Sequence, residues 1–178
     1  AAAHKHVPLM EAFPDEAVKN NVYGSFVVAR AAGRARIRRF LMVSTDKAVR
    51  PSSVMGATKR VAERIVLGMN GDGSGTRYAV TRFGNVLGSR GSVLPLFVEQ
   101  IRRGGPVTVT HPEVTRYFMS IREAARLVVK AATLDCGEIF VLDMGQPVNI
   151  HELARRLVML SGRHPDEIPI VITGIRPG

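Results

Sequence analysis

The stretch from Arg39 to Lys47, RFLMVSTDK, places four consecutive apolar residues directly before two hydroxyls, a carboxylate and an ammonium. A short apolar run that ends in polar residues is typical of a strand buried in a parallel sheet. Because open α/β sheets bind ligands at the carboxyl ends of their strands, we predict a strand at Arg39–Val43, followed by a ligand-binding cluster from Ser44 to Lys47. Such a cluster is also typical of a turn or a helix cap, and the residues alone leave that alternative open.

Helical and strand periodicities alternate along the rest of the chain, which favours an α/β fold with a largely parallel sheet. Pro14 suits the first position of a helix that runs from Asp15 to Arg30, with Gly33 as its stop. The other predicted helices are 54–69, 93–103, 121–132 and 150–160, and the other predicted strands are 78–82, 107–110, 139–142 and 168–172.

The chain lacks the usual opening of a dinucleotide-binding sheet, which is a strand, a G-x-G-x-x-G turn and a helix whose N-terminus faces the pyrophosphate. The glycine-rich turn from Asn70 to Gly75 follows a predicted helix instead of a strand, so it does not suit that role. We therefore predict a Rossmann-like doubly wound α/β fold that is missing its first βαβ half.

The chain is strongly basic, with 25 Lys and Arg against 15 Asp and Glu and a net charge of +10. This excess suits a nucleic acid, an anionic membrane surface or a phosphate-bearing ligand. Its densest cluster lacks the interleaved aromatic residues of a single-strand nucleic-acid groove, so we expect a solvated loop or a membrane-facing patch and no nucleic-acid partner. The cluster consists of Arg34, Arg36, Arg38 and Arg39.

No run of eighteen apolar residues and no signal-peptide pattern occurs, so we expect a soluble chain without a membrane span. His111, His151 and His164 show no metal-ligand spacing, and no metal site is expected. Met55 and Lys59 are four residues apart on a predicted helix and share one face. A core methionine and an exposed lysine would give the same pattern.

Two segments together carry a resemblance to a known family. STDKAV at 44–49 with VMGATKR at 54–60 resembles the active-site stretch of the polysaccharide-biosynthesis nucleotide-sugar 4,6-dehydratases, which are extended short-chain dehydrogenases. Short-chain dehydrogenases normally carry Tyr-x-x-x-Lys there, and Met55 stands in place of the tyrosine. In this respect the chain resembles the branch of the family that carries methionine at this position and acts on UDP-N-acetylglucosamine with retention at C5.

Further segments match the family in the same order along the chain. They are 1–11, which lines the cofactor in the family, NVYGS at 21–25, the substrate loop at 82–93, the phosphate-side motif TRYFM at 115–119, and RPG at 176–178. The family motif continues with a glutamate after RPG, and its absence here supports truncation. Because the first half of the Rossmann unit is also missing, we expect a carboxy-terminal fragment of a longer enzyme.

The resemblance implies NAD as cofactor, a UDP-sugar as substrate and a hydro-lyase reaction: oxidation at C4, loss of water across C5 and C6, and reduction at C6. It implies Asp46 as the acid for the departing hydroxyl, Lys47 as the base for the C5 proton and Thr45 as a hydrogen-bond partner of O4. The implied catalytic set is Thr45, Asp46, Lys47, Met55 and Lys59. The implied cofactor-binding set is Ala2, Ala3, Lys5, Asn21, Ser44, Lys59 and Phe83. The implied substrate-binding set is Asn85, Arg90, Ser92, Val93, Thr108, Arg116 and Arg176.

The resemblance also implies a division of the chain and a cellular setting. Residues 1–83 are expected to form the second half of the NAD-binding domain with the active site. Residues 84–178 are expected to be mainly a small substrate-binding subdomain, interleaved with late Rossmann elements. The full-length protein would work in capsule, lipopolysaccharide or other glycan synthesis at the cytoplasmic face of the inner membrane, attached only through segments outside this chain, and we expect a homo-oligomer.

Three other functions remain open from the sequence. A nucleotide-sugar 4-epimerase shares the fold and cofactor but does not need an acid and a base at C5 and C6, so Asp46 and Lys47 favour dehydration. C5-inverting dehydratases resemble this chain at Asp46 and Lys47 but carry tyrosine at the position of Met55, so Met55 favours retention at C5. A non-catalytic nucleotide-sugar binding module is the third alternative.

Overall fold

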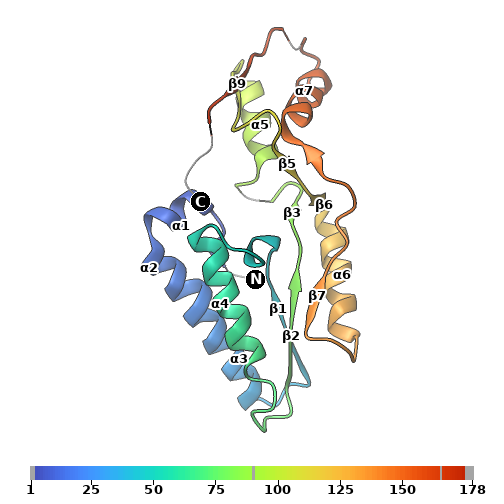
Figure 1. Cartoon of the computed structure of the whole chain (residues 1–178). Coiled ribbons are helices and arrows are strands. Elements are labelled where there is room, and N and C mark those ends of the chain that lie inside the picture. The colour runs from blue at the N-terminus through green and yellow to red at the C-terminus, as the bar shows by residue number, and fades with distance from the viewer. Residues whose placement is uncertain (1–2, 90, 165, 175–178) are drawn as a thin grey trace. The chain divides into compact units, whose positions relative to one another are not determined.

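The computed structural model describes residues 3–89, 91–164 and 166–174 (Figure 1). These residues divide into two compact units. The first takes in 3–83 and 125–143, and the second takes in 84–124 and 144–174. Among the described residues, no helix is both long enough and apolar enough to cross a membrane.

The first unit is built on a three-stranded parallel sheet. Its order is β1 (Arg39–Val43), β2 (Arg77–Arg82) and β7 (Ile139–Val141). Val43 pairs with Thr81, and Thr81 pairs with Phe140, so the carboxyl ends of the three strands lie at one edge. The predictions of strands at these places, and of a parallel sheet, are confirmed.

One continuous helical stretch begins at Pro14 and ends at Arg34, made of α2 (Pro14–Ala17), η1 (Val18–Tyr23) and α3 (Gly24–Arg34). Pro14 occupies its first turn, as predicted. The sequence pattern did not predict that η1 is a π-helix. It also did not predict the short helix α1 (Val7–Ala12), which has only six residues.

Gly33 does not end this helix, contrary to the prediction. It lies inside α3, where an added Cβ would come within 2.5 Å of the Tyr78 hydroxyl. Glycine is therefore needed there for close packing of α3 against β2. The helix ends at Arg34, and just beyond it Arg36 lies in the left-handed region at φ 49°, with its N–H bonded to the carbonyl of Gly33.

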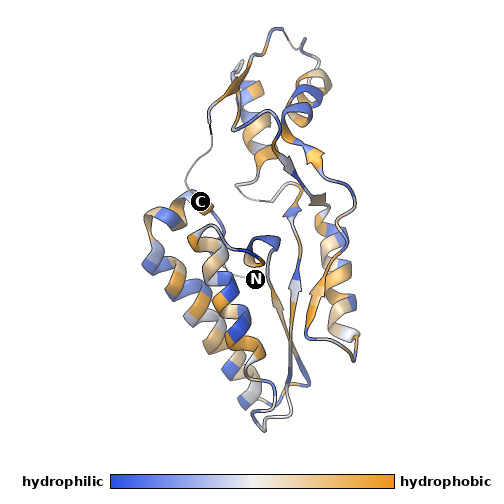
Figure 2. Cartoon of the chain, in the orientation of Figure 1, coloured by the Kyte–Doolittle hydropathy of each residue, from blue (hydrophilic) through white to orange (hydrophobic). Residues whose placement is uncertain are grey.

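The core of the first unit joins both long helices to the sheet. α4 (Val54–Leu67) contributes Ala62 and Val66, which are completely buried with Tyr78 and Val80 of β2. A fully buried valine contributes about 1.5–3 kcal/mol relative to an exposed one. Orange and blue positions alternate along α3 and α4, as expected for helices with one face against a core (Figure 2).

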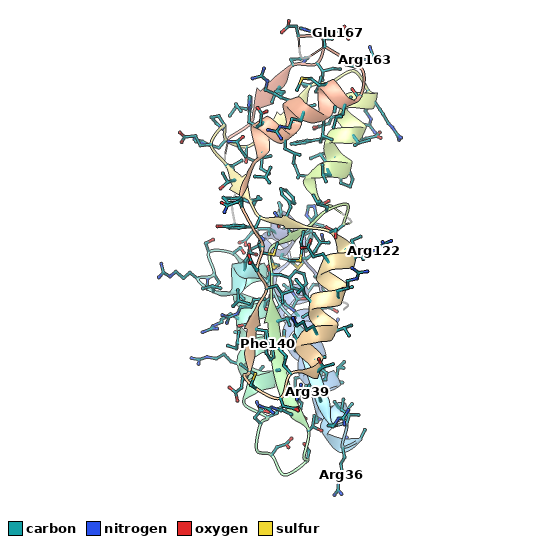
Figure 3. All side chains as sticks on the ribbon, turned by 90° about the vertical axis from the view of Figure 1, so that its right-hand side faces the viewer. Arg36, Arg39, Arg122, Phe140, Arg163 and Glu167 are labelled. Carbon is teal, nitrogen blue, oxygen red and sulfur yellow. The ribbon has the colours of Figure 1, made fainter. Side chains whose placement is uncertain are left out.

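Helices lie on both faces of this sheet. α3 and α4 are on one side, and residues 125–133 of α6 (Ile121–Thr133) are on the other (Figure 1). Arg39, at the start of β1, donates to the carbonyl of Ala132 at 2.8 Å and pairs with Asp135, which fastens β1 to the end of α6 (Figure 3). The doubly wound arrangement predicted from the sequence is therefore present.

The second unit combines short strands with two amphipathic helices, α5 (Val93–Arg102) and α7 (Ile150–Leu160). β4 (Val107–Val109) and β9 (Ile170–Ile172) pair in parallel, and their side chains share a core with Phe97. The helices at 93–103 and 150–160 and the strands near 107 and 170 were predicted. Four two-residue strands, too short for a periodic pattern, were not: β3 (Asn85–Val86), β5 (Thr115–Arg116), β6 (Phe118–Met119) and β8 (Val148–Asn149).

Candidate active site

The backbone of the polar cluster after β1 is hydrogen-bonded to the end of β2 and to the residue that follows it. Ser44 N–H donates to the carbonyl of Thr81 at 2.7 Å, and Asp46 N–H donates to the carbonyl of Phe83 at 3.1 Å. The chain then turns through the short 3-10 helix η2 (Asp46–Ala48), whose N-cap is Thr45. The helix-cap interpretation of this sequence is thus correct, since Thr45 Oγ1 accepts from the Lys47 N–H at 3.4 Å, while the ligand-binding interpretation stays a prediction.

The side chains of Thr45, Asp46 and Lys47 contact one another. The Thr45 hydroxyl donates to Asp46 Oδ1 at 2.8 Å, and Lys47 Nζ lies 2.9 Å from the same oxygen. The Lys47 and Asp46 side chains are 33% and 44% exposed, so both can be reached from solvent. An ion pair this exposed adds little to stability, about 0–1 kcal/mol.

Gly56 sets the distance between η2 and α4. A Cβ at this position would come within 2.5 Å of the Lys47 carbonyl oxygen and 3.3 Å of Pro51. Any larger residue must therefore move the backbone of Lys47. This glycine places the first turn of α4 directly against the cluster.

Two side chains accept hydrogen bonds from the free backbone N–H groups at the N-terminus of α4. Ser53 Oγ accepts from the Gly56 N–H at 3.2 Å, and Glu11 Oε1 accepts from the Val54 N–H at 2.7 Å. A carboxylate at this end also interacts favourably with the helix dipole. Glu11 comes from α1, so the unpredicted helix helps to fix the start of α4.

Met55 is almost completely buried among Met10 and Ala17, with partly buried Val7 and Val54 around it. This environment is that of a core methionine. A catalytic position for Met55 stays a prediction.

Lys59 is buried, at 7% exposure, and its ammonium donates to the carbonyl of Val43 at 2.7 Å. The alternative of an exposed lysine is therefore wrong. Burial lowers the pKa of Lys59, while the negative charge of Glu63, one turn along α4, acts in the opposite direction. The side chain brings a cation to the carboxyl end of β1.

Asn21, in the π-helix, ties the N-terminal segment to α4. Its side chain exchanges hydrogen bonds with the backbone of His4, at 2.8 and 2.9 Å, and its amide donates to Thr58 Oγ1 at 3.2 Å. Next to His4, the pKa of Lys5 is lowered by partial burial and by the positive charge of Lys47. Lys5, in the segment predicted to line the cofactor, therefore lies within electrostatic reach of Lys47.

The Ser44 hydroxyl donates to Glu63 Oε1 at 2.6 Å, and Glu63 also receives both arms of Arg82. Sequence reasoning missed Glu63, which is completely buried. One signal was available, since Glu63 lies four residues after Lys59 and so on the same helix face.

The predicted substrate residues of the second unit occupy different settings. Ser92 is the N-cap of α5, and its buried hydroxyl has no partner among the described residues. The Thr108 hydroxyl is engaged by Gln100 at 2.8 Å, and Arg116 is exposed in β5. Asn85 begins β3 and Val93 begins α5.

Three predicted residues, Ala2, Arg90 and Arg176, lie outside the described part of the chain. Ala3 and Phe83 are described: Ala3 is exposed, and Phe83 directly follows β2. Ligand contacts of both predicted binding sets stay predictions. No three His, Cys, Asp or Glu side chains of the described residues are grouped so as to hold a metal ion.

The family model described as "Polysaccharide biosynthesis protein" matches residues 1–178. The chain is 60% identical to the capsular polysaccharide biosynthesis protein CapD of Staphylococcus aureus and 59% identical to the probable polysaccharide biosynthesis protein EpsC of Bacillus subtilis. Both matches cover 100% of this chain but only 30% of the relative. A UDP-glucose 4-epimerase of Rickettsia prowazekii is 42% identical over 91% of this chain and 48% of its own length.

Solved structures share the fold. The X-ray structure of Pen from Bacillus thuringiensis superposes with a TM-score of 0.91 and 35% identity, over 100% of this chain and 56% of Pen. The dTDP-glucose 4,6-dehydratase DesIV of Streptomyces venezuelae, with NAD and TYD bound, gives 0.86 over 97% of this chain and 59% of DesIV, at 22% identity. The second likeness concerns the fold alone. Since the family model covers every residue, the chain belongs to the polysaccharide biosynthesis protein family, and its fold is of the Rossmann type.

Proposed function

We propose that this chain carries the acid–base groups of an NAD-dependent nucleotide-sugar 4,6-dehydratase that acts on UDP-N-acetylglucosamine. The observation that supports this best is the contact between Asp46 and Lys47, 2.9 Å apart and open to solvent at the carboxyl end of β1. Elimination of water needs an acid and a base on adjacent carbons of one sugar, and these two side chains are adjacent.

The described residues suit a bound NAD. Lys59 has three N–H donors, and among the described residues it makes one hydrogen bond, to Val43, so donors remain for ribose hydroxyls. Ala3, Lys5, Asn21 and Phe83 are proposed to complete the cofactor site together with Ala2, while Ser44 acts in it through its backbone. When bound, NAD would supply the hydride acceptor for oxidation at C4 and the hydride donor for reduction at C6.

In the proposed reaction Asp46, directly or through Thr45, accepts the O4 proton as C4 is oxidised and then gives it to the C6 hydroxyl, which leaves as water. Lys47, acting as a neutral amine, takes the C5 proton and returns a proton to C5 when C6 is reduced. Both groups end in the forms in which they began, so protons balance over the whole cycle. Thr45, bonded to Asp46, is proposed to hold O4.

A nucleotide-sugar 4-epimerase is the second candidate, because relatives named UDP-glucose 4-epimerase are 42% identical to this chain. An epimerase inverts C4 and leaves C5 and C6 untouched, so it has no use for the Asp46–Lys47 pair. A C5-inverting dehydratase is less favoured, since Met55 replaces the expected tyrosine. A binding module without activity would not need a solvent-accessible acid and base.

The remaining parts of the proposal concern the whole protein. Residues 84–178 are proposed to bind the nucleotide sugar, with Asn85, Arg90, Arg116 and Arg176 toward its diphosphate, because guanidinium forks match phosphate oxygens. The longer protein is proposed to work in glycan synthesis at the cytoplasmic membrane face, as a homo-oligomer.

The test is identification of the product. Full-length protein is incubated with UDP-N-acetylglucosamine and the product is analysed by NMR. A 4-keto-6-deoxy sugar with retained C5 configuration is expected, and Asp46→Asn should abolish it. Asp166→Asn, a matched change on an exposed side chain, should not. Formation of the C4 epimer alone would establish the epimerase instead.

A further inference from the structure

Glu63 is a buried carboxylate with partners on three sides. It lies on α4 with no exposed surface, and it accepts from the Ser44 hydroxyl at 2.6 Å and from Arg82 Nε at 2.9 Å. A second Arg82 nitrogen and Arg60, at 3.2 Å, bond its other oxygen. Burial acts to raise the pKa of Glu63, but hydrogen bonds from Arg82 and Ser44 outweigh it and hold the pKa below its usual range. The side chain is therefore a charged anchor inside the first unit.

The partners of Glu63 stand at the ends of the two strands that form the candidate site. Arg82 is the last residue of β2, and Ser44 directly follows β1. The next residue after Ser44 is Thr45, whose hydroxyl bonds Asp46. Any shift of Ser44 is therefore passed through one peptide unit to the acid–base cluster.

The Ser44 side chain is directed into the protein, toward α4. The residue is only 5% exposed, and its hydroxyl is donated to Glu63. This geometry gives the hydroxyl a role in fixing the loop. A direct role on a ligand would need that hydrogen bond to break.

We propose that Glu63 is a positioning residue, which acts through the Ser44 hydroxyl to hold the Thr45-Asp46-Lys47 loop in its active arrangement at the end of β1. Arg82 completes the anchor by fixing the same carboxylate to β2. The inference rests on the proposed function for its kinetic readout, but its structural readout does not depend on the reaction.

A buried ion pair that serves only stability is the competing explanation, since loss of one partner of such a pair is destabilising in any fold. Ser44→Ala separates the two. It removes the hydroxyl but leaves Glu63 paired with Arg82, so the fold is kept. Arg60→Ala is the matched control, because it removes a different and more exposed partner of the same carboxylate.

The experiment uses the full-length protein and its Ser44→Ala, Glu63→Gln, double and Arg60→Ala variants. Hydrogen exchange is followed in the peptide spanning residues 44–49, where Asp46 N–H bonds Phe83 and Lys47 N–H bonds Thr45. Exchange there should be at least about tenfold faster in Ser44→Ala and Glu63→Gln, and unchanged in Arg60→Ala. Ser44→Thr, which keeps a hydroxyl, should restore the slow exchange.

The kinetic arm compares kcat for dehydration among the same variants. Ser44→Ala and Glu63→Gln should each lower kcat about tenfold or more, with KM for the sugar nucleotide within about twofold. The double variant should be no worse than Glu63→Gln, because residues acting through one contact are not additive. Two outcomes would overturn the proposal. One is a kcat of the double variant reduced by the product of the two single reductions, and the other is a hydrogen-exchange rate at 44–49 in Ser44→Ala equal to that of the wild type. If the wild-type protein performs another reaction, dehydration fails as the function while the exchange result still decides the role of Glu63.

Discussion

The carbonyl oxygen of Lys47 lies against Gly56 so closely that a Cβ on the glycine would come within 2.5 Å of it. The proposed base therefore owes its backbone position to the first turn of α4. Burial of Met55, and the hydrogen bond that the Val54 N–H donates to the Glu11 carboxylate, fix the position of this first turn of α4.

Gly56→Ala is expected to lower stability by about 1–3 kcal/mol, the usual cost of overpacking, because the backbone of Lys47 must move. The dehydration rate should fall with it. Urea unfolding and steady-state kinetics measure the two effects. Gly24→Ala is the control, since a Cβ there meets only an ordinary contact at 3.8 Å and alanine favours a helix. Equal behaviour of the two variants would show that the close approach to Lys47 is not required.

Lys47→Ala is expected to reduce exchange of the C5 hydrogen with solvent deuterium by about a hundredfold or more, the scale for loss of a general base. NMR of the recovered sugar measures the exchange. Lys19→Ala, which removes an exposed lysine on η1, should leave it unchanged. Wild-type exchange in Lys47→Ala would assign the base to another residue.

The thioether of Met55 has no ionisable proton and accepts hydrogen bonds weakly, so it cannot take the proton from O4 during oxidation. Thr45, Asp46 or a water they hold must do so instead. Thr45→Val and Asp46→Asn should each slow the appearance of reduced cofactor in a single turnover by about a hundredfold or more. Met55→Leu, which preserves apolar volume in the Met10 cluster, should stay near the wild-type rate. Undiminished rates in both polar variants would place the oxidation base elsewhere.

Glu63 should make stability depend on acid pH. Its pKa in the folded protein lies below its usual value, so its stabilisation is complete above about pH 4.3, the pKa of an unfolded glutamate, and is lost as pH falls through the lower folded pKa. Glu63→Gln should be less stable than wild type at pH 6 by about 3–5 kcal/mol. It should also lose less stability than wild type between pH 6 and pH 3.

Urea unfolding at both pH values measures this prediction. Glu152→Gln, which breaks an exposed pair with Arg156, should differ from wild type by no more than about 1 kcal/mol at either pH. A Glu63→Gln variant that follows the wild-type pH dependence would mean that Glu63 is not the titrating group.

The elements with strong periodicity could be predicted from the sequence. β1 has a continuous apolar run, and α4 has an apolar stripe, so both were found close to their observed ends. The π-helix η1 was missed because its side-chain pattern continues that of the flanking α-helix. The four two-residue strands were missed because tertiary pairing, and no local pattern, creates them.

The candidate site was predicted only where local sequence carries its chemistry. Thr45, Asp46 and Lys47 are consecutive, so their contact follows from one short turn. Glu63 and Gly56 were missed because their roles depend on partners brought from other segments: Ser44 and Arg82 for the first, and the Lys47 carbonyl for the second. A buried glutamate is also contrary to the ordinary expectation that charged residues of a helix face solvent.

The most direct test of the central claim is the mass spectrum of the product formed by the full-length protein from UDP-N-acetylglucosamine in deuterated water. If Asp46 and Lys47 carry out the elimination, the product has lost one water and has gained one non-exchangeable deuterium, at C5. An unchanged substrate mass without carbon-bound deuterium, accompanied by the C4 epimer, would contradict the account.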